Sequence, residues 1–270
     1  MIITDQFVML NFPKTGSTFV RNVLKQIHEE LTFSSSDRLL MGLGLKKKPY
    51  YENLWLPRIR NTYREQVQDE HGIYSQIPER HRGKTIVSVK RDLFERFVST
   101  YNYGYWKSSP WMEEQALKEV YPNFPDISFK EFVFLLNKKD PTANHKLIDR
   151  ELPVGPSTSQ FILFYFKDPF TVLKNIDDDY VDSDRYRTDM ASVEFLDQAN
   201  LNEELHAFLK RHNYKNSEID FILDAERQNV STLDSDSIEK YYDQELMDYI
   251  RHRERLLFRI MRELQNNKSV

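Results

Sequence analysis

Residues 7–19 are FVMLNFPKTGSTF, and they are the most informative stretch of the chain. The apolar run 7–12 is typical of a buried strand, and it stops at Pro13. From Ser17 to Leu31 the apolar side chains recur with helical spacing, which places them on one face of a helix. We therefore predict a strand, a tight glycine-containing loop and a helix in direct succession.

Further strands and helices alternate along the rest of the chain. Thr85–Val89 is rich in β-branched residues and predicts a strand, and a helix follows from Asp92 to about Asn102. Residues 193–196 indicate a short strand, whereas the apolar run 161–166 is buried in either a helix or a strand. This alternation predicts one α/β domain over 1–270, with a central, mainly parallel sheet between two layers of helices.

The remaining segments carry weaker signals. Residues 34–83 predict loops with short helices. Ser128 and Glu131 form a capping-box pattern before a helix over 129–136. We also predict that Asn202 caps a helix over 203–212, and that one long charged helix runs from about Ser237 to Asn266.

Composition excludes several classes of protein. The chain has 270 residues, 40% of them hydrophobic, and 38 Lys and Arg against 42 Asp and Glu give a net charge of −4. A disordered chain or a strongly basic nucleic-acid binder would be more polar or more positive. There is no cysteine, which excludes disulfides and thiolate chemistry. Without a signal peptide or an apolar run of membrane-spanning length, the sequence predicts a cytoplasmic protein.

The loop Pro13-Lys14-Thr15-Gly16-Ser17-Thr18 has the makings of an anion site. A glycine turn that leads into a helix presents backbone N–H groups and the positive end of the helix dipole. Lys14 adds a full charge, and Ser17 and Thr18 add hydroxyl donors. The order differs from a Walker A loop, in which lysine follows glycine. An ordinary strand-to-helix turn is the alternative explanation.

A second group of polar residues follows the second predicted strand. Arg91 closes that strand, and Ser99 lies eight residues further on, about two helical turns away. A guanidinium and a hydroxyl on one face would hold a second phosphate. The alternative is a surface arginine paired with Asp92 or Glu95.

Taken together, the two segments resemble the sulfotransferase family that uses 3′-phosphoadenosine 5′-phosphosulfate (PAPS). That family carries a Pro-Lys-x-Gly-Thr-Thr loop after its first strand and an Arg-Asp-Pro-x-x-Arg-x-x-Ser-x-Tyr segment at a later strand end. This chain has 13–18 as PKTGST and 91–101 as RDLFERFVSTY, in the same order and with the same arginine-to-serine spacing. The chain departs from the pattern at two positions. Ser17 stands in place of a threonine and keeps the hydroxyl group, and Leu93 stands in place of a proline and should change only how the helix begins.

The resemblance implies a P-loop-like core and assigns roles to residues. By this resemblance, the 5′ end of PAPS would be bound by Lys14, Thr15, Gly16, Ser17 and Thr18. Arg91 and Ser99 would bind the 3′-phosphate. Phe19 would lie near the adenine. The product would be 3′-phosphoadenosine 5′-phosphate (PAP), and no metal is implied. The acidic run 177–184 lacks the glycine of a calcium loop.

The resemblance also implies a general base in the loop before the second nucleotide strand. His71 lies there, twenty residues before Arg91, and an imidazole titrates near neutral pH. Glu70 is the reserve candidate, because some branches of the family use a glutamate. We expect His71 and Lys14 to be the catalytic residues.

The acceptor is less constrained by the sequence. We expect a small-molecule or glycan acceptor, such as a carbohydrate or glycolipid hydroxyl, because aromatic side chains that suit sugar rings follow the second segment, although core packing explains them equally well. These aromatic residues are Tyr101, Tyr103, Tyr105, Trp106 and Trp111. Two other functions stay open, an ATP-dependent kinase that uses the same loop and a non-catalytic nucleotide-binding module of the same fold.

Overall fold

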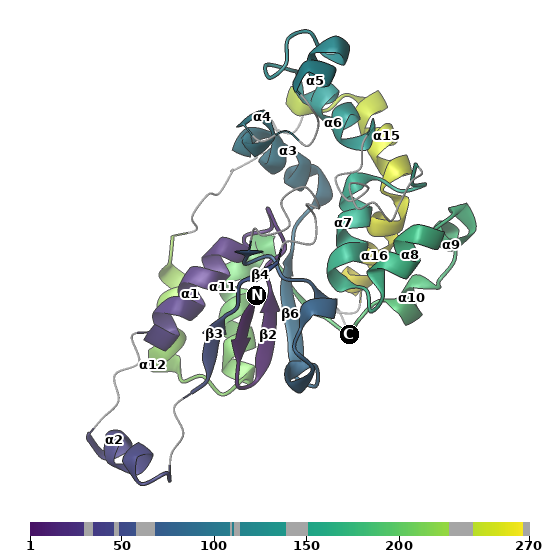
Figure 1. Cartoon of the computed structure of the whole chain (residues 1–270). Coiled ribbons are helices and arrows are strands. Elements are labelled where there is room, and N and C mark those ends of the chain that lie inside the picture. The colour runs from purple at the N-terminus through teal and green to yellow at the C-terminus, as the bar shows by residue number, and fades with distance from the viewer. Residues whose placement is uncertain are drawn as a thin grey trace.

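The computed structural model describes residues 1–29, 35–45, 49–57, 68–108, 110, 114–138, 151–226 and 240–266. Its centre is a five-stranded sheet in the order β3-β1-β2-β6-β7, with helices on both faces (Figure 1). The strands are β1 (Ile2–Thr4), β2 (Phe7–Leu10), β3 (Tyr51–Asn53), β6 (Thr85–Lys90) and β7 (Glu194–Asp197). The predicted α/β architecture is confirmed.

Three strands form the parallel part of the sheet. β2 pairs with β6 through Met9 and Val87, and β6 pairs with β7 through Ser88 and Phe195, both in parallel. Their carboxyl ends therefore lie at one edge, where ligands bind in open α/β sheets. β1 runs antiparallel to both β2 and β3. Neither β1 nor β3 was predicted, because runs of three residues are too short to show an alternating pattern.

Alternate residues of the central strands feed two separate cores. Met9 and Val87 pack under α1 (Ser17–Glu29) and α11 (Leu201–Arg211) on one face of the sheet. Val8 and Leu10 point to the other face, which is covered by α7 (Pro156–Tyr165) and α16 (Arg255–Asn266) (Figure 1). Because both faces are covered, the central strands are almost wholly apolar.

The remaining elements are short. The two-stranded sheet pairs β4 (Leu56–Pro57) with β5 (Gln68–Asp69). The other helices are α2 (Ser35–Gly42), α3 (Leu93–Tyr103), α4 (Tyr105–Ser108), α5 (Glu114–Val120), α6 (Phe129–Lys138), α8 (Pro169–Asn175), α9 (Asp178–Asp182), α10 (Tyr186–Asp189), α12 (Asn216–Ile219), α13 (Phe221–Asp224) and α15 (Gln244–Arg253), with single 3₁₀ turns at Tyr74–Gln76, Glu79–His81 and Gln198–Asn200. Within the described ranges, no helix is long and apolar enough to cross a membrane.

The two helix patterns around 92 and 128 are confirmed in detail. The Asp92 carboxylate accepts the N–H of Glu95 at 3.0 Å and caps α3. Ser128 and Glu131 close a reciprocal capping box before α6, with the Glu131 carboxylate accepting the Ser128 N–H at 2.7 Å. The apolar run 161–166, for which either a helix or a strand was predicted, is helical up to Tyr165 and belongs to α7. This helix is buried on nearly all sides, so its sequence shows no helical periodicity.

Two helix boundaries were wrong. Asn202 lies inside α11, and its side chain amide donates to the carbonyls of Ile222 and Ala225, which ties α11 to the segment after it. The long charged helix is two helices, α15 and α16, separated at Glu254. Residues 237–239, where that helix was expected to begin, lie outside the described residues.

Glu254, at the junction of the two helices, is bound to the start of α7. Its side chain is fully buried, and the carboxylate accepts the N–H groups of Ser157 (3.0 Å) and Thr158 (2.7 Å) at the N-terminus of α7. A negative charge at this end of a helix complements the helix dipole. Gly155 makes room for it, because a Cβ there would lie 2.3 Å from the carboxylate. Burial raises the pKa of Glu254.

We predict that Glu254→Ala destabilises the fold by about 3 kcal/mol, since each buried donor left without a partner costs about 1–3 kcal/mol. Urea unfolding followed by circular dichroism measures the loss. Glu254→Gln, which keeps an acceptor oxygen, should lose less, and Glu119→Ala on the exposed surface of α5 is the control. An alanine variant within about 0.5 kcal/mol of wild type would contradict the role assigned to this carboxylate.

Candidate nucleotide-binding site

The first loop is held closed by its own hydroxyl groups. Thr15 and Ser17 both donate to the carbonyl of Phe12, at 2.8 and 3.0 Å. The backbone turns through two residues with positive φ, Lys14 at 65° and Gly16 at 94°. Glycine adopts such a value without strain, whereas a side chain at 16 would also press on Leu201, because its Cβ would lie 3.1 Å from that side chain. This tight loop therefore connects the end of β2 directly to the start of α1.

The candidate side chains of this loop do not all point the same way. Thr15 is buried with its hydroxyl turned toward the loop backbone, and Thr18 is exposed on the first turn of α1. Phe19 is 6% exposed and packs in the core between α1 and the sheet. Its observed contacts are those of a core residue, and the predicted contact with adenine stays a prediction.

The second segment is organised around the end of β6. The Arg91 side chain is buried, and its Nε donates to the Glu95 carboxylate at 3.1 Å. This is the arginine–glutamate pair of the alternative explanation, with the arginine side chain buried and the glutamate partly exposed. Ser99 is half-buried on α3, about two turns further along. Lys90, which sequence analysis did not single out, is buried and ion-paired with Asp197 at the end of β7.

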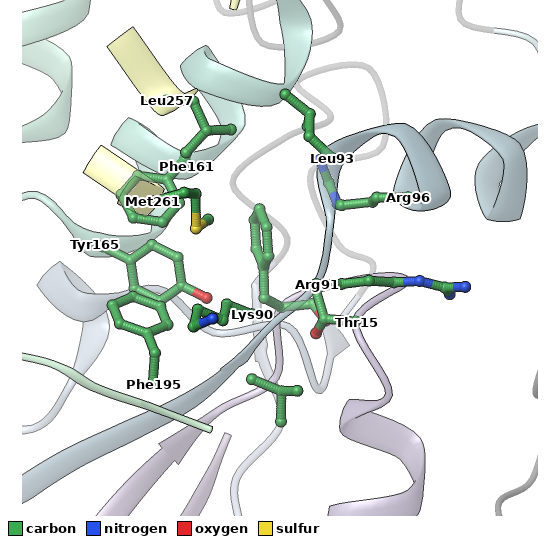
Figure 2. A pocket seen from close by; sticks show the side chains of 12 residues that line it. Thr15, Lys90, Arg91, Leu93, Arg96, Phe161, Tyr165, Phe195, Leu257 and Met261 are labelled. Carbon is green, nitrogen blue, oxygen red and sulfur yellow. The ribbon is translucent and has the colours of Figure 1, made fainter. Parts of the chain in front are cut away.

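The two segments meet through Arg96. This buried arginine donates from Nε to the Pro13 carbonyl at 3.3 Å, and its guanidinium lies 4.4 Å from the centre of the Phe12 ring. Thr15 from the first loop and Arg91 from the second line the same pocket, and Figure 2 shows them side by side. Stretches about seventy-five residues apart in the sequence therefore lie in contact at this point of the fold.

Arg96 was missed as a functional candidate, although it occupies the second arginine of the quoted motif. Further contacts hold it in place, because its guanidinium also donates to the Gln160 side chain on α7. Burial lowers the pKa of Arg96 to about 10, and the negative charge of Glu254 partly offsets that effect. Arg96 therefore stays charged at neutral pH and connects the loop, α3 and α7.

Positive charge gathers at this edge of the sheet. Lys14 comes from the loop after β2, Lys90 is the last residue of β6, and Arg91 and Arg96 follow β6. Burial, followed by the neighbouring charge of Arg91, lowers the pKa of Lys14 to about 8. The carboxylates of Asp197 and Glu95 pair with two of these groups, and the cations gathered at this edge of the sheet still favour the binding of an anion.

His71 lies next to the start of the first loop. Its Nδ1 is 2.7 Å from the carbonyl oxygen of Asn11, and its backbone N–H donates to the Asp69 carboxylate at 2.9 Å. A carbonyl oxygen only accepts, so Nδ1 carries the proton and the lone pair of the neutral ring is on Nε2. The Asn11 side chain donates to the Glu70 carbonyl at 3.0 Å, which is a second hydrogen bond between Asn11 and the segment that carries His71.

Glu70, the reserve candidate for the base, is engaged elsewhere. Its carboxylate forms an ion pair with Arg21 on α1, and both side chains are largely buried. This pair fastens the segment carrying His71 to the helix that follows the first loop. A carboxylate neutralised by an arginine is a weaker base than a free one.

The aromatic residues after the second segment divide into two groups. Trp106 is buried, and Tyr101 donates from its hydroxyl to the Ile127 carbonyl at 2.8 Å, so these two pack in the core. Tyr103 and Tyr105 are exposed. Trp111 lies outside the described residues. Among the side chains that the structure places, no three histidines, aspartates or glutamates are grouped to hold a metal ion.

A family model described as "Sulfotransferase family" matches residues 2–152, which contain both loops, His71 and all of α3. No curated protein and no solved structure matches the chain.

Proposed function

The chain belongs to the sulfotransferase family, and on this premise we propose that it transfers a sulfuryl group from PAPS to a hydroxyl group of a carbohydrate or glycolipid. The observation that carries the proposal is the meeting of the two loops at Arg96. A nucleotide with a charged group at each end needs two anion sites at a fixed separation, and one buried arginine that contacts both loops fixes it.

The residues of the site suit a nucleotide with phosphates at its 3′ and 5′ positions. Lys14, the Gly16–Thr18 backbone and the Thr18 hydroxyl would hold the 5′ end, at the N-terminus of α1. Arg91 and Ser99 would hold the 3′-phosphate. The nucleotide, when bound, supplies the sulfuryl group, and every other task falls to side chains of the chain itself.

In this proposal His71 and Lys14 act on opposite sides of the transferring group. Nε2 of His71 takes the proton of the acceptor hydroxyl as the acceptor oxygen forms its bond to sulfur. The bond between sulfur and the phosphate oxygen breaks, and the electron pair stays on that oxygen. Lys14 and the N–H groups of the loop stabilise the negative charge that develops there. The products are the sulfate ester, PAP and a protonated His71.

The test is thermal stabilisation by PAP, compared with ATP and magnesium. At one hundred times its dissociation constant PAP should stabilise the protein by about 2.7 kcal/mol, and it should be preferred over ATP. Stabilisation by ATP and magnesium alone would favour the kinase. Binding of PAP without sulfation of any acceptor in a broad panel would favour the non-catalytic module.

A further inference from the structure

One polar side chain interrupts the apolar run 7–12, and it lies where β2 leaves the sheet. Asn11 follows the last residue of β2 and is 0% exposed. Burying an amide is unfavourable unless its polar atoms are hydrogen-bonded. The partners of Asn11 therefore decide whether this residue serves the core or the candidate site.

Two polar groups of Asn11 hold the segment that carries His71. The backbone carbonyl of Asn11 is 2.7 Å from Nδ1 of His71, which donates to it, and the side-chain Nδ2 donates to the Glu70 carbonyl at 3.0 Å. The first contact is available to any residue at position 11, whereas the second needs the amide donor. The side chain thus fixes the peptide that bears the imidazole, and the backbone fixes the imidazole itself.

The remaining polar atom of the Asn11 side chain is unfavourable for stability. Its Oδ1 is buried and has no hydrogen-bond partner among the residues that the structure describes, and a buried acceptor left unpaired costs folding free energy. Ser88 on β6 is the opposite case, because its hydroxyl donates to the Leu10 carbonyl at 2.8 Å and lies 2.8 Å from the Tyr165 hydroxyl. A local departure of this kind is typical of a residue that serves a functional site rather than the core.

Asn11 also adjoins the residue that closes the first loop. The Phe12 carbonyl accepts both hydroxyls that hold this loop in place. Two consecutive carbonyls at the end of β2 therefore hold the His71 ring and the loop that carries Lys14. Placement matters here, because a displacement of about 1 Å can lower the rate of a reaction about a hundredfold.

We propose that Asn11 is a positioning residue for His71. Its side chain holds the peptide between Glu70 and His71, so that Nδ1 stays on the Asn11 carbonyl and Nε2 keeps a fixed direction relative to the first loop. This inference rests on the proposed function, in which Nε2 takes the proton of the acceptor. Without the amide donor, the peptide gains freedom and the hydrogen bond that selects the Nδ1–H tautomer weakens. A ring in the Nε2–H form has no lone pair on Nε2 and cannot take the proton there.

The first measurement is the tautomer of the neutral His71 ring in the PAP-loaded protein, observed by ¹⁵N NMR of the histidine side chains. His71→Ala identifies the signals of this ring. We expect the Nδ1–H form in wild type and a mixture of both tautomers in Asn11→Leu, a variant of similar volume without the donor. Asn11→Ala, which leaves a small cavity instead of an apolar group, should behave in the same way.

The second measurement is PAP formation from PAPS with the best acceptor of the panel. Asn11→Leu should lower kcat about tenfold to a hundredfold and leave PAP affinity unchanged. In the His71→Ala background the same substitution should cause no further loss, because Asn11 acts through that ring. Ser88→Ala is the matched control, since Ser88 is also 0% exposed and binds the carbonyl of Leu10, next to Asn11. It should lower stability and leave the His71 tautomer and kcat as in wild type.

A tautomer and a kcat equal to those of wild type in Asn11→Leu would overturn the inference, and so would an equal loss in the His71→Ala background. Failure of both Asn11 variants to fold would also overturn it, since the side chain would then belong to the fold. If the tautomers change as expected but wild type forms no PAP with any acceptor, the proposed function fails and the hold of Asn11 on the ring is supported.

Discussion

Lys14→Ala should lower kcat for sulfuryl transfer by about a hundredfold to a thousandfold, while the protein remains folded. Removing one preorganised donor from a developing oxyanion typically costs about 2.7–4 kcal/mol. Lys14 is the cation of the first loop, and its backbone is set in an unusual conformation, with φ of 65°. Without the charge at this position, the proposed site offers the leaving oxygen only the backbone N–H groups and the Thr18 hydroxyl.

The measurement is the rate of PAP formation at saturating acceptor. Lys25→Ala is the control, because Lys25 is an exposed lysine on α1, the helix that the first loop enters. Lys25→Ala should keep the rate of wild type. An unchanged kcat in Lys14→Ala would remove Lys14 from the transfer step.

The pH dependence of PAP binding tests the same residue independently. The pKa of Lys14 is lowered to about 8 by burial and by Arg91, so its ammonium form is lost as the pH rises through 8 in the free protein. In the proposed site PAP binds the charged form of Lys14, and its affinity should therefore fall between pH 7 and pH 9. The affinity of Lys14→Ala should change much less over this range, since the titrating group is gone.

Patterns within adjacent residues were enough to predict the first long strand, the loop after it and the first helix. The strand 7–10, the loop after it and α1 follow from an apolar run, a glycine and helical spacing in adjacent residues. The meeting of the loops could be expected because both follow neighbouring parallel strands. The resemblance alone predicts the roles of Lys14, Thr18, Arg91 and Ser99, and the contact between the two loops is compatible with these roles.

Long-range contacts decided what the sequence did not reveal. Glu254, where the two helices separate, binds N–H groups of α7 nearly one hundred residues earlier, and no pattern within the helix itself marks the junction. Asn202 has the side chain of a helix cap but donates to carbonyls twenty or more residues away. Arg96 could have been found, because it is part of the quoted motif, yet only its contact with Pro13 shows that it joins the loops.

His71→Ala should lower kcat by about a hundredfold to ten-thousandfold, the contribution typical of a positioned general base. The Asn11 carbonyl, 2.7 Å from Nδ1, fixes the ring and leaves the lone pair on Nε2, where it can accept a proton. PAP affinity should stay close to that of wild type, because His71 is not expected to touch either phosphate. Thermal stabilisation by PAP and the single-turnover rate measure the two effects separately.

Chemical rescue separates a base from a merely structural histidine. Added imidazole should restore part of the rate of His71→Ala, since a small base can occupy the space that the side chain leaves. Imidazole should not restore Glu70→Ala, because the Glu70 carboxylate pairs with Arg21 and its loss loosens the segment that holds His71. His206→Ala is the control, because His206 lies on α11 and its side chain pairs with Asp220. An active His71→Ala together with an inactive Glu70→Ala would transfer the role of the base to Glu70.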